Sequence, residues 1–228
     1  MSRYFTDHTW HFLRGLARHN ERPWFQAHRD EFLEHVRTPF QRLLEDLQPT
    51  LAGISPHLRA DPAPVGGSLY RIHRDTRFAN DKSPYKPWQG AWLFHERRRL
   101  QPCPGFYIHL QPGACFVAGG IWHPELPIQR RIRQFIVDNP AAWERAVHAP
   151  AFERRYALMD ENRLVRVPPG YPEDFPWRED LRNRSFVASR PLQDATMTGP
   201  RLLPVLRKDL QALAPLVDYL CAALELPF

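Results

Sequence analysis

Residues 105–122, GFYIHLQPGACFVAGGIW, consist of two apolar runs on either side of a turn, and this pattern decides the fold class. The runs at 105–110 and 114–122 are short and rich in aromatic and β-branched residues, so they predict strands. The three residues QPG separate them, which favours a tight hairpin. Because parallel strands need a long crossover connection, this short turn predicts an antiparallel meander.

Three further stretches are predicted as strands of the same sheet. Residues 69–78, LYRIHRDTRF, alternate between two faces with a period of two. Residues 90–96 form another apolar run, and a last strand is predicted at about 182–190. Together these stretches predict an antiparallel sheet of about five strands, most of it within residues 68–122.

Helical periodicity surrounds the predicted sheet. Apolar residues recur at spacings of three, four and seven over 7–52, and the Pro- and Gly-rich segment 53–67 is predicted as a loop. A second helical part is predicted at 127–158, and leucines three and four apart predict a long C-terminal helix at 200–225. Segregated helices and strands predict an α+β fold, and 228 residues with 43% hydrophobic content predict a single domain covering the whole chain, 1–228.

Composition limits the partners that can be expected. The net charge of +6 and the isoelectric point near 9.5 favour anionic partners and permit nucleic acid without requiring it. The N-terminus has no uninterrupted apolar stretch, and no run approaches the roughly 18 apolar residues of a membrane span, so a soluble, cytoplasmic protein without a membrane partner is expected. The three widely spaced cysteines predict neither a disulfide framework nor a zinc site.

Residues 71–86, RIHRDTRFANDKSPYK, concentrate charge in an unusual way. Arginine supplies 28 of the chain's 31 basic residues, yet two of its three lysines, Lys82 and Lys86, lie in this motif. Lysine is therefore rare in this chain, and its use at two positions of one motif is unusual. A regular strand over 69–78 would place on one face Tyr70, Ile72, Thr76 and Phe78, and on the other Arg71, His73, Asp75 and Arg77. Arg74 would then share the apolar face, which requires either an acidic partner or a bulge.

Two functions for the motif stay open. In the first, its cations contact a phosphate, a carboxylate or a nucleic-acid backbone, because arginine offers a planar fork and lysine a mobile charge. The predicted contacts are Arg71, Arg77, Lys82 and Lys86, with Tyr85 orienting the ligand. The predicted framework ion pairs involve Arg74, Asp75 and Asp81. In the second, the same charges form an internal salt-bridge network with no ligand.

Other residues are predicted as accessories to this site, namely His73, Trp24, Gly119, Gly120 and Trp122. His73 is the first candidate for a general base, with a solvated side chain as the alternative. The two glycines mark a bulge or a close backbone approach, or else line the anion site with their amides. Aromatic side chains next to the charged elements could stack bases in a single-strand groove, or they belong to the core.

Several reaction classes have little support in the sequence. His28, Glu31 and His35 have metal-compatible spacing, but they flank Phe32 on a charged helix, and no metal site is predicted. The chain contains no GxSxG, GxGxxG or GxxxxGK[ST] motif, which disfavours a serine nucleophile and the common nucleotide sites.

The motif RxxRDxRFxxDKxPYK at 71–86 resembles the signature of domain-of-unknown-function family 2461, which occurs in bacteria and fungi. Residues 12–32, 118–125 and 130–136 are also similar to elements of that family, so the resemblance covers nearly the whole chain. The chain departs from the pattern at Phe175, where similar proteins tend to have histidine, and at Arg184, where lysine is common. The resemblance implies a site at the motif and supplies no reaction.

The sequence therefore leads to one main expectation and two alternatives. The main expectation is a protein that binds a phosphorylated or other anionic small molecule through residues 71–86, with catalysis of its conversion and any cofactor left open. One alternative is a single-stranded nucleic-acid-binding or repair-associated module. The other is a structural or protein-interaction domain whose charged motif is an internal network.

Overall fold

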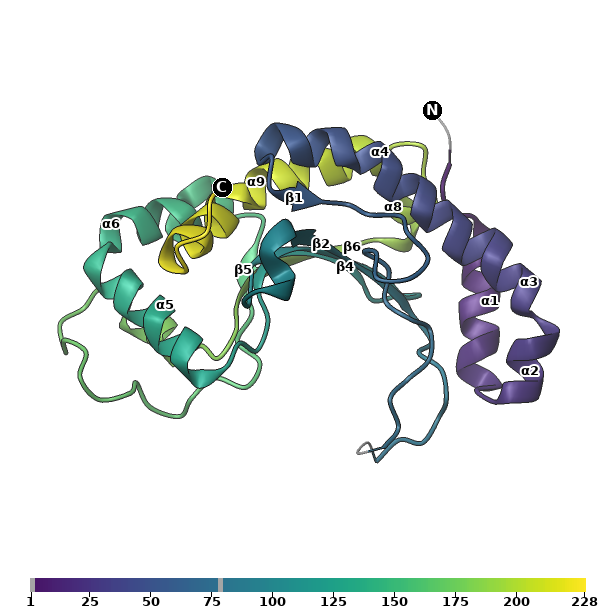
Figure 1. The fold of residues 1–228 in the computed structure, drawn as a ribbon, viewed down its shortest axis with the longest axis horizontal. Coiled ribbons are helices and arrows are strands. Elements are labelled where there is room, and N and C mark those ends of the chain that lie inside the picture. The colour runs from purple at the N-terminus through teal and green to yellow at the C-terminus, as the bar shows by residue number, and fades with distance from the viewer. Residues whose placement is uncertain (1–2, 78–79) are drawn as a thin grey trace.

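A computed structural model describes residues 3–77 and 80–228. A curved antiparallel sheet lies at the centre, with helices along one side of it and at both of its ends (Figure 1). The predicted α+β class is therefore confirmed. Phe78, which the sequence places on the apolar face of a strand, lies outside the described residues.

Six strands form the sheet in the described ranges, compared with the prediction of about five. They are β1 (Leu58–Arg59), β2 (Gln89–His95), β3 (Gly105–Leu110), β4 (Cys115–Ile121), β5 (Ala157–Leu158) and β6 (Phe186–Leu192). Their order is β1-β2-β3-β4-β6-β5, and every neighbouring pair is antiparallel. The two-residue strands β1 and β5 lie in segments predicted as a loop and as helix, because only pairing with a distant partner makes them strands.

Helices occupy the N-terminal part of the chain from Asp7 to Ile54, where the sequence predicts them over 7–52. They are α1 (Asp7–Arg18), α2 (Arg22–Ala27), α3 (Arg29–Phe32), the π-helical turn η1 (Leu33–Arg37) and α4 (Thr38–Ile54). Pro39 lies in the first turn of α4. A proline is tolerated there because its missing N–H has no helical partner in any case, so the π-helical turn leads into α4 without a gap.

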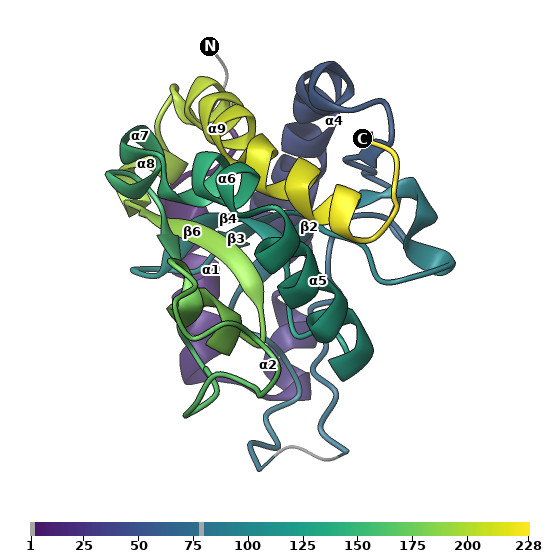
Figure 2. The same cartoon turned by 90° about the vertical axis from the view of Figure 1, so that its left-hand side faces the viewer.

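The remaining helices all come after β2 in the chain. They are η2 (Glu96–Arg99), α5 (Leu126–Asp138), α6 (Pro140–Trp143), η3 (Glu144–His148), α7 (Pro150–Glu153), η4 (Arg178–Arg182), α8 (Asp194–Met197) and α9 (Leu202–Ala223). Figure 2 shows α9 crossing the molecule above the strands, with α5 beside it. Within the described ranges, no helix is both long enough and apolar enough to cross a bilayer.

The main core lies between the sheet and the helices α4 and α9. Phe106, Ile108 and Val117 point to this side and are fully buried. Gly119 is needed here because an added Cβ would lie 3.1 Å from the Cβ of Leu213 on α9. The next residue, Gly120, has φ +137° and approaches the backbone of β6 so closely that any side chain would clash. Gly120 therefore serves the close backbone approach that the sequence predicts as one alternative, whereas Gly119 makes room for the side chains of Leu213 and Phe106.

We call residues 68–77 and 80–88 the arm. Its structure differs from the strand that the sequence predicts at 69–78. The segment is extended but is not the regular strand predicted at 69–78, since two isolated bridges, Leu69 with Ala91 and His73 with Tyr85, replace a continuous ladder. Prolines 84 and 87 lack N–H donors, so the ladder cannot continue through them. The arm projects from the sheet on the side away from α4 and α9 (Figure 1).

Side-chain directions in the arm also differ from regular alternation. Ile72 is buried, as predicted, but Tyr70 is 42% exposed although the sequence places it on the same apolar face. Arg74 is half-buried and is bonded to an acid, which is the partner that the sequence requires for it.

Candidate functional site

Two ion pairs shape the outer part of the arm. Arg74 Nη1 lies 2.6 Å from Asp81 Oδ2, and Arg77 contacts Asp75 through both Nε and Nη2, at 3.0 and 2.8 Å. The hydrogen bonds from Arg77 lower the pKa of Asp75. The backbone N–H of Ser83, more than the charge of Arg74, lowers the pKa of Asp81. The arm thus holds Arg74, Asp75 and Asp81 in the arrangement expected of framework pairs, and it adds Arg77 to them.

The predicted anion contacts fall into two groups. At the outer part of the arm, Arg77 faces Asp75, and Lys82 Nζ donates to the backbone carbonyl of Thr76 at 3.0 Å. At the base of the arm, Lys86 Nζ donates to the carbonyl of Arg71 at 2.9 Å. The structure therefore does not bring the four cations to a single point.

Lys86 lies in a strongly positive environment at the base of the arm. Its ammonium group is 5.6 Å from the ring centre of Tyr70 and 5.1 Å from that of Trp88. Burial, followed by the charges of Arg71 and Arg74, lowers the pKa of Lys86. An anion near Lys86 would offset this repulsion between like charges.

Tyr85 anchors the arm to the N-terminal helices. Its side chain is buried, and its ring stacks on Phe25 of α2 with centroids 4.2 Å apart. The amide side chain of Asn20 donates to the Tyr85 carbonyl at 2.9 Å and accepts from its N–H at 3.0 Å. This packing explains the presence of Tyr85 without the ligand-orienting role that the sequence suggests. The ring of His73 packs 5.1 Å from that of Tyr85.

A pocket of about 300 Å³ lies between the N-terminal helices and the base of the arm. Arg29, Arg37 and Arg71 line it together with His73, and among its described lining residues none is acidic. Its other walls are formed by Phe25, Phe32, Leu33, Pro64, Val65, Leu69, Tyr70, Ile72 and Gln89. The pocket lining thus combines three arginines with an apolar wall, and of the predicted contacts only Arg71 belongs to it.

Arg29 and Arg37 were not predicted as site residues from the sequence. Arg29, Leu33 and Arg37 are four residues apart, a spacing that puts side chains on one helical face. That spacing was the available signal, but it could not show that the face meets Arg71 from a segment more than thirty residues further along the chain. Arg37 also donates to the carbonyl of Pro64 at 2.9 Å, which ties the helical wall to the loop before the arm.

The other predicted accessories lie away from this pocket. Trp24 stacks on His28 with centroids 4.0 Å apart and packs against Gly15, so it belongs to the N-terminal helices. Gly120 pairs with Gly105 at one end of β3, whereas the arm joins the sheet beside Gln89, which pairs with the other end of β3. Gly119 and Trp122, the neighbours of Gly120 in and just after β4, lie at that far end too, so the structure does not place these three residues with Arg71.

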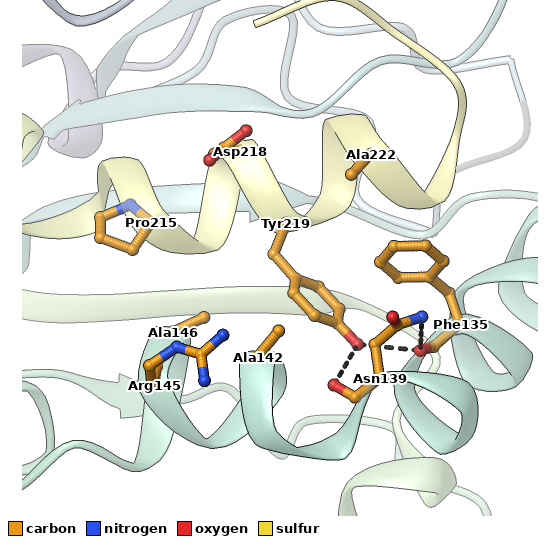
Figure 3. Close-up of a pocket in the computed structure, with 9 residues that line it drawn as sticks. All are labelled: Phe135, Asn139, Ala142, Arg145, Ala146, Pro215, Asp218, Tyr219 and Ala222. Atoms are coloured by element: carbon orange, nitrogen blue, oxygen red, sulfur yellow. Dashed lines mark hydrogen bonds between the residues drawn. The ribbon is translucent and has the colours of Figure 1, made fainter.

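A second cavity, of about 310 Å³, lies between α9 and the α5–η3 region (Figure 3). Tyr219 donates its hydroxyl to the carbonyls of Phe135 and Asn139 on the cavity wall. Burial raises the pKa of Asp218, and Arg145 lies on the same wall. Because this cavity carries charges of both signs, it is a weaker candidate for an anion than the pocket with three arginines.

The histidines weighed as metal ligands have other contacts. His28 Nδ1 lies 2.8 Å from the carbonyl of Trp24, and His35 stacks on His8 with centroids 4.9 Å apart. Across 3–77 and 80–228, no group of three or more His, Cys, Asp or Glu side chains could hold a metal ion.

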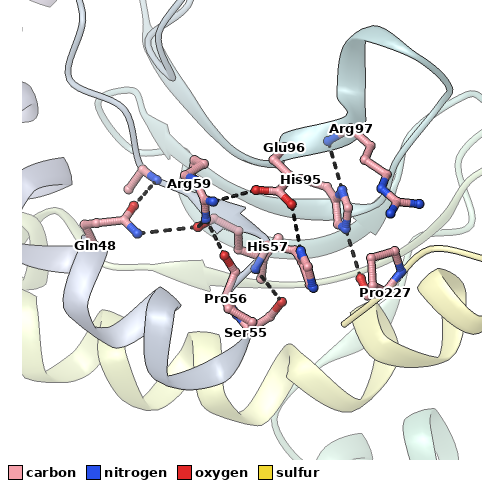
Figure 4. A network of polar contacts seen from close by, with 11 residues as sticks. Gln48, Ser55, Pro56, His57, Arg59, His95, Glu96, Arg97 and Pro227 are labelled. Atoms are coloured by element: carbon pink, nitrogen blue, oxygen red, sulfur yellow. Dashed lines mark hydrogen bonds and ion pairs between the residues drawn. The ribbon is translucent and has the colours of Figure 1, made fainter.

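A polar network at the edge of the sheet is structural (Figure 4). Glu96 accepts hydrogen bonds from His57 and Arg59 and so ties β1 to the end of β2. The buried ring of His95 connects the N–H of Arg97 to the carbonyl of Pro227. The network lies beside the C-terminal residues and contributes nothing to the pocket lining.

Comparisons with known proteins identify the family and no function. Neither the curated proteins nor the solved structures contain a match to this chain. One family model, described as conserved hypothetical protein (DUF2461), matches residues 8–219. That match includes the N-terminal helices, the arm, the whole sheet and nearly all of α9. The chain therefore belongs to the DUF2461 family.

Proposed function

We propose that the pocket binds a small molecule that carries an anionic group next to an apolar group. The observation that supports this is the presence of Arg29, Arg37 and Arg71 around about 300 Å³ with no acidic residue in the described lining. An anion bound among three cationic side chains would offset the repulsion between them. Guanidinium groups bind phosphate and carboxylate oxygens through paired hydrogen bonds.

The apolar wall narrows the class of ligand. Phe25, Phe32 and Ile72 are buried side chains with edges on the pocket, so they can pack against an aromatic or aliphatic body. A bare inorganic ion would leave this wall in contact with water. We therefore favour an organic phosphate or carboxylate over a free ion.

His73 is the one imidazole in the described lining of the pocket. If the ligand is also converted chemically, His73 is the lining side chain that would act as acid or base, and the arginines would stabilise developing negative charge. The three cysteines are buried and unbridged, which fits the reducing cytoplasm that we propose as the location.

Thermal shift measurements test this proposal with three related probes. Phenyl phosphate carries both required groups, whereas inorganic phosphate and phenol each carry one. We expect phenyl phosphate to raise the melting temperature by about 5 °C at one hundred times its dissociation constant. At equal concentration the other two probes should give smaller shifts.

Two variants locate the binding site. Arg29→Ala combined with Arg71→Ala should abolish the shift, while Arg18→Ala, which removes an exposed arginine of α1, should retain it. Equal shifts in all three proteins would show that the anion binds elsewhere. If no member of a panel of organic phosphates and carboxylates shifts the melting temperature of any of the three proteins, the proposal of an anion pocket loses its support.

A further inference from the structure

The side of the sheet away from α4 and α9 carries aromatic rings in place of helices. In Figure 1 the described part of the chain places both long helices on the other side, and no helix packs across the centre of this one. We call its rings the ring track: Tyr70, Trp88, Trp92, Phe94, Tyr107 and Phe116. Their centroids lie close together, for example 5.8 Å for Tyr70 and Tyr107, and 5.5 Å for Tyr107 and Phe116.

Two glycines allow rings of the track to lie against the sheet. A Cβ on Gly90 would come within 2.8 Å of Cζ of Tyr107, and a Cβ on Gly105 would come within 2.8 Å of Nε1 of Trp92. Each ring therefore occupies the space above a residue that has no side chain. Trp92 and Tyr107 are nevertheless only half-buried, whereas Phe106 on the opposite face is fully buried. Part of each side chain therefore remains exposed to solvent.

Cations flank the ring track at both ends. Lys86 lies over Tyr70 and Trp88 at the start of β2, and the guanidinium carbon of Arg98 lies 3.3 Å from the ring centre of Phe94 near its end. Trp88 and Phe94 are six residues apart along an extended chain, which corresponds to about 20 Å.

We propose that the ring track binds single-stranded nucleic acid, with bases stacked on Trp92 and Tyr107 and phosphates next to Lys86 and Arg98. Partly exposed aromatic rings between positive charges offer the chemistry that bases and phosphates require together. The length of about 20 Å favours a strand of several nucleotides, since one nucleotide would cover a single ring and reach one cation. The pocket shares Tyr70 with the ring track, but its arginines differ from Arg98, and neither Trp92 nor Tyr107 belongs to its lining.

Fluorescence anisotropy with a labelled oligothymidylate of about 15 nucleotides tests the proposal. Trp92→Leu should weaken binding at least about tenfold, because leucine keeps an apolar side chain at this position but removes the stacking surface. Lys86→Ala should reduce the slope of log affinity against log salt by about one. The matched control is Lys208→Ala, because this exposed lysine is on α9, which covers the other side of the sheet, and its removal should change neither quantity.

Circular dichroism and the melting temperature of each variant show whether it is folded, and Lys86→Ala keeps the test valid if Trp92→Leu does not fold. Absence of oligonucleotide binding at about 50 mM salt overturns the proposal. Binding that is insensitive to both Trp92→Leu and Lys86→Ala does so as well. Equal affinity for a mononucleotide, or for a duplex, would overturn the assignment to a single strand. None of these outcomes depends on the phenyl phosphate experiment.

Discussion

Asp209 and Asp75 both accept hydrogen bonds from arginine, but their surroundings differ. Asp209 on α9 is fully buried, and Arg190 contacts both of its oxygens at 2.6 and 2.7 Å. Arg155 and Tyr156 complete its shell at 2.8 and 2.7 Å. Asp75 has a single arginine partner and a side chain that is 62% exposed. Only Asp209 is enclosed by partners that would be left without a counter-charge if it were removed.

Asp209→Ala should lower the free energy of unfolding by about 3 kcal/mol, because two partly buried guanidinium groups lose their carboxylate. Asp75→Ala, which breaks an exposed pair, should leave the free energy of unfolding nearly unchanged. Urea denaturation of both variants measures the difference. Similar losses in the two would show that burial does not decide the strength of these pairs.

His95 should make stability depend on pH. Its ring is buried, its Nδ1 accepts from the N–H of Arg97, and burial lowers its pKa below 6.5. Between the lowered value and 6.5 the unfolded chain binds more protons than the folded chain, so stability rises with pH there. The stabilisation is complete above 6.5 and is lost as the pH falls through the lowered pKa.

Chemical denaturation between about pH 5 and 8 measures this dependence. His95→Gln keeps a polar side chain at this position but removes the titrating group, so the free energy of unfolding should depend less on pH in this variant. Burial also lowers the pKa of His109, so part of the slope should persist until both histidines are replaced. A slope that is unchanged in the double variant would assign the pH dependence to other groups.

The arm is attached to the N-terminal helices by the amide of Asn20 and by the stacking of Tyr85 on Phe25. Asn20 satisfies both backbone groups of Tyr85, in a segment where the prolines prevent a continuous ladder. Asn20→Ala should speed hydrogen exchange in residues 70–77 and 84–86 and lower stability by about 1 to 3 kcal/mol, because buried donors and acceptors lose their partner. Gln26→Ala, an exposed change on α2, is the control. Unchanged exchange in the arm would show that the packing of Tyr85 on Phe25 is sufficient.

Elements that depend on local sequence patterns could be predicted, whereas the structure of the arm could not. The hairpin β3–β4 and the helix α9 follow from apolar periodicity and turn residues, and they lie where the sequence predicts them. The arm has the periodicity of a strand, but Pro84 and Pro87 interrupt the pairing that would make it one. The strands β1 and β5 could not be predicted, because each has two residues and is too short to show periodicity.

The candidate site also combines contacts that the sequence predicts with contacts that depend on tertiary packing. The ion pairs within 71–86 could be anticipated because their partners are close in sequence, as Arg74 and Asp81 are. The approach of Arg29 and Arg37 to Arg71 depends on how α3 and η1 pack beside the arm, and the ring track depends on strand register. Register brings Trp92 opposite Tyr107, and no pattern in either strand alone contains that pairing.

At the scale of the whole molecule, one sheet separates two kinds of surface. Its helix-covered side holds the main core, and its other side holds the ring track and the base of the arm. The pocket lined by three arginines lies where the arm meets the N-terminal helices. Because the two features differ in most of their residues, the ligands that we propose for them can be tested separately.

The position of α9 over the sheet has a consequence during synthesis on the ribosome. The strands β2, β3, β4 and β6 are complete by Leu192, but α9, which covers β4, begins only at Leu202. A nascent chain that has emerged as far as β6 therefore carries a nearly complete sheet whose most apolar side is still uncovered by its last helix. Exposed apolar surface of this kind promotes aggregation and chaperone binding, so we expect the nascent chain to need protection in the interval before α9 emerges.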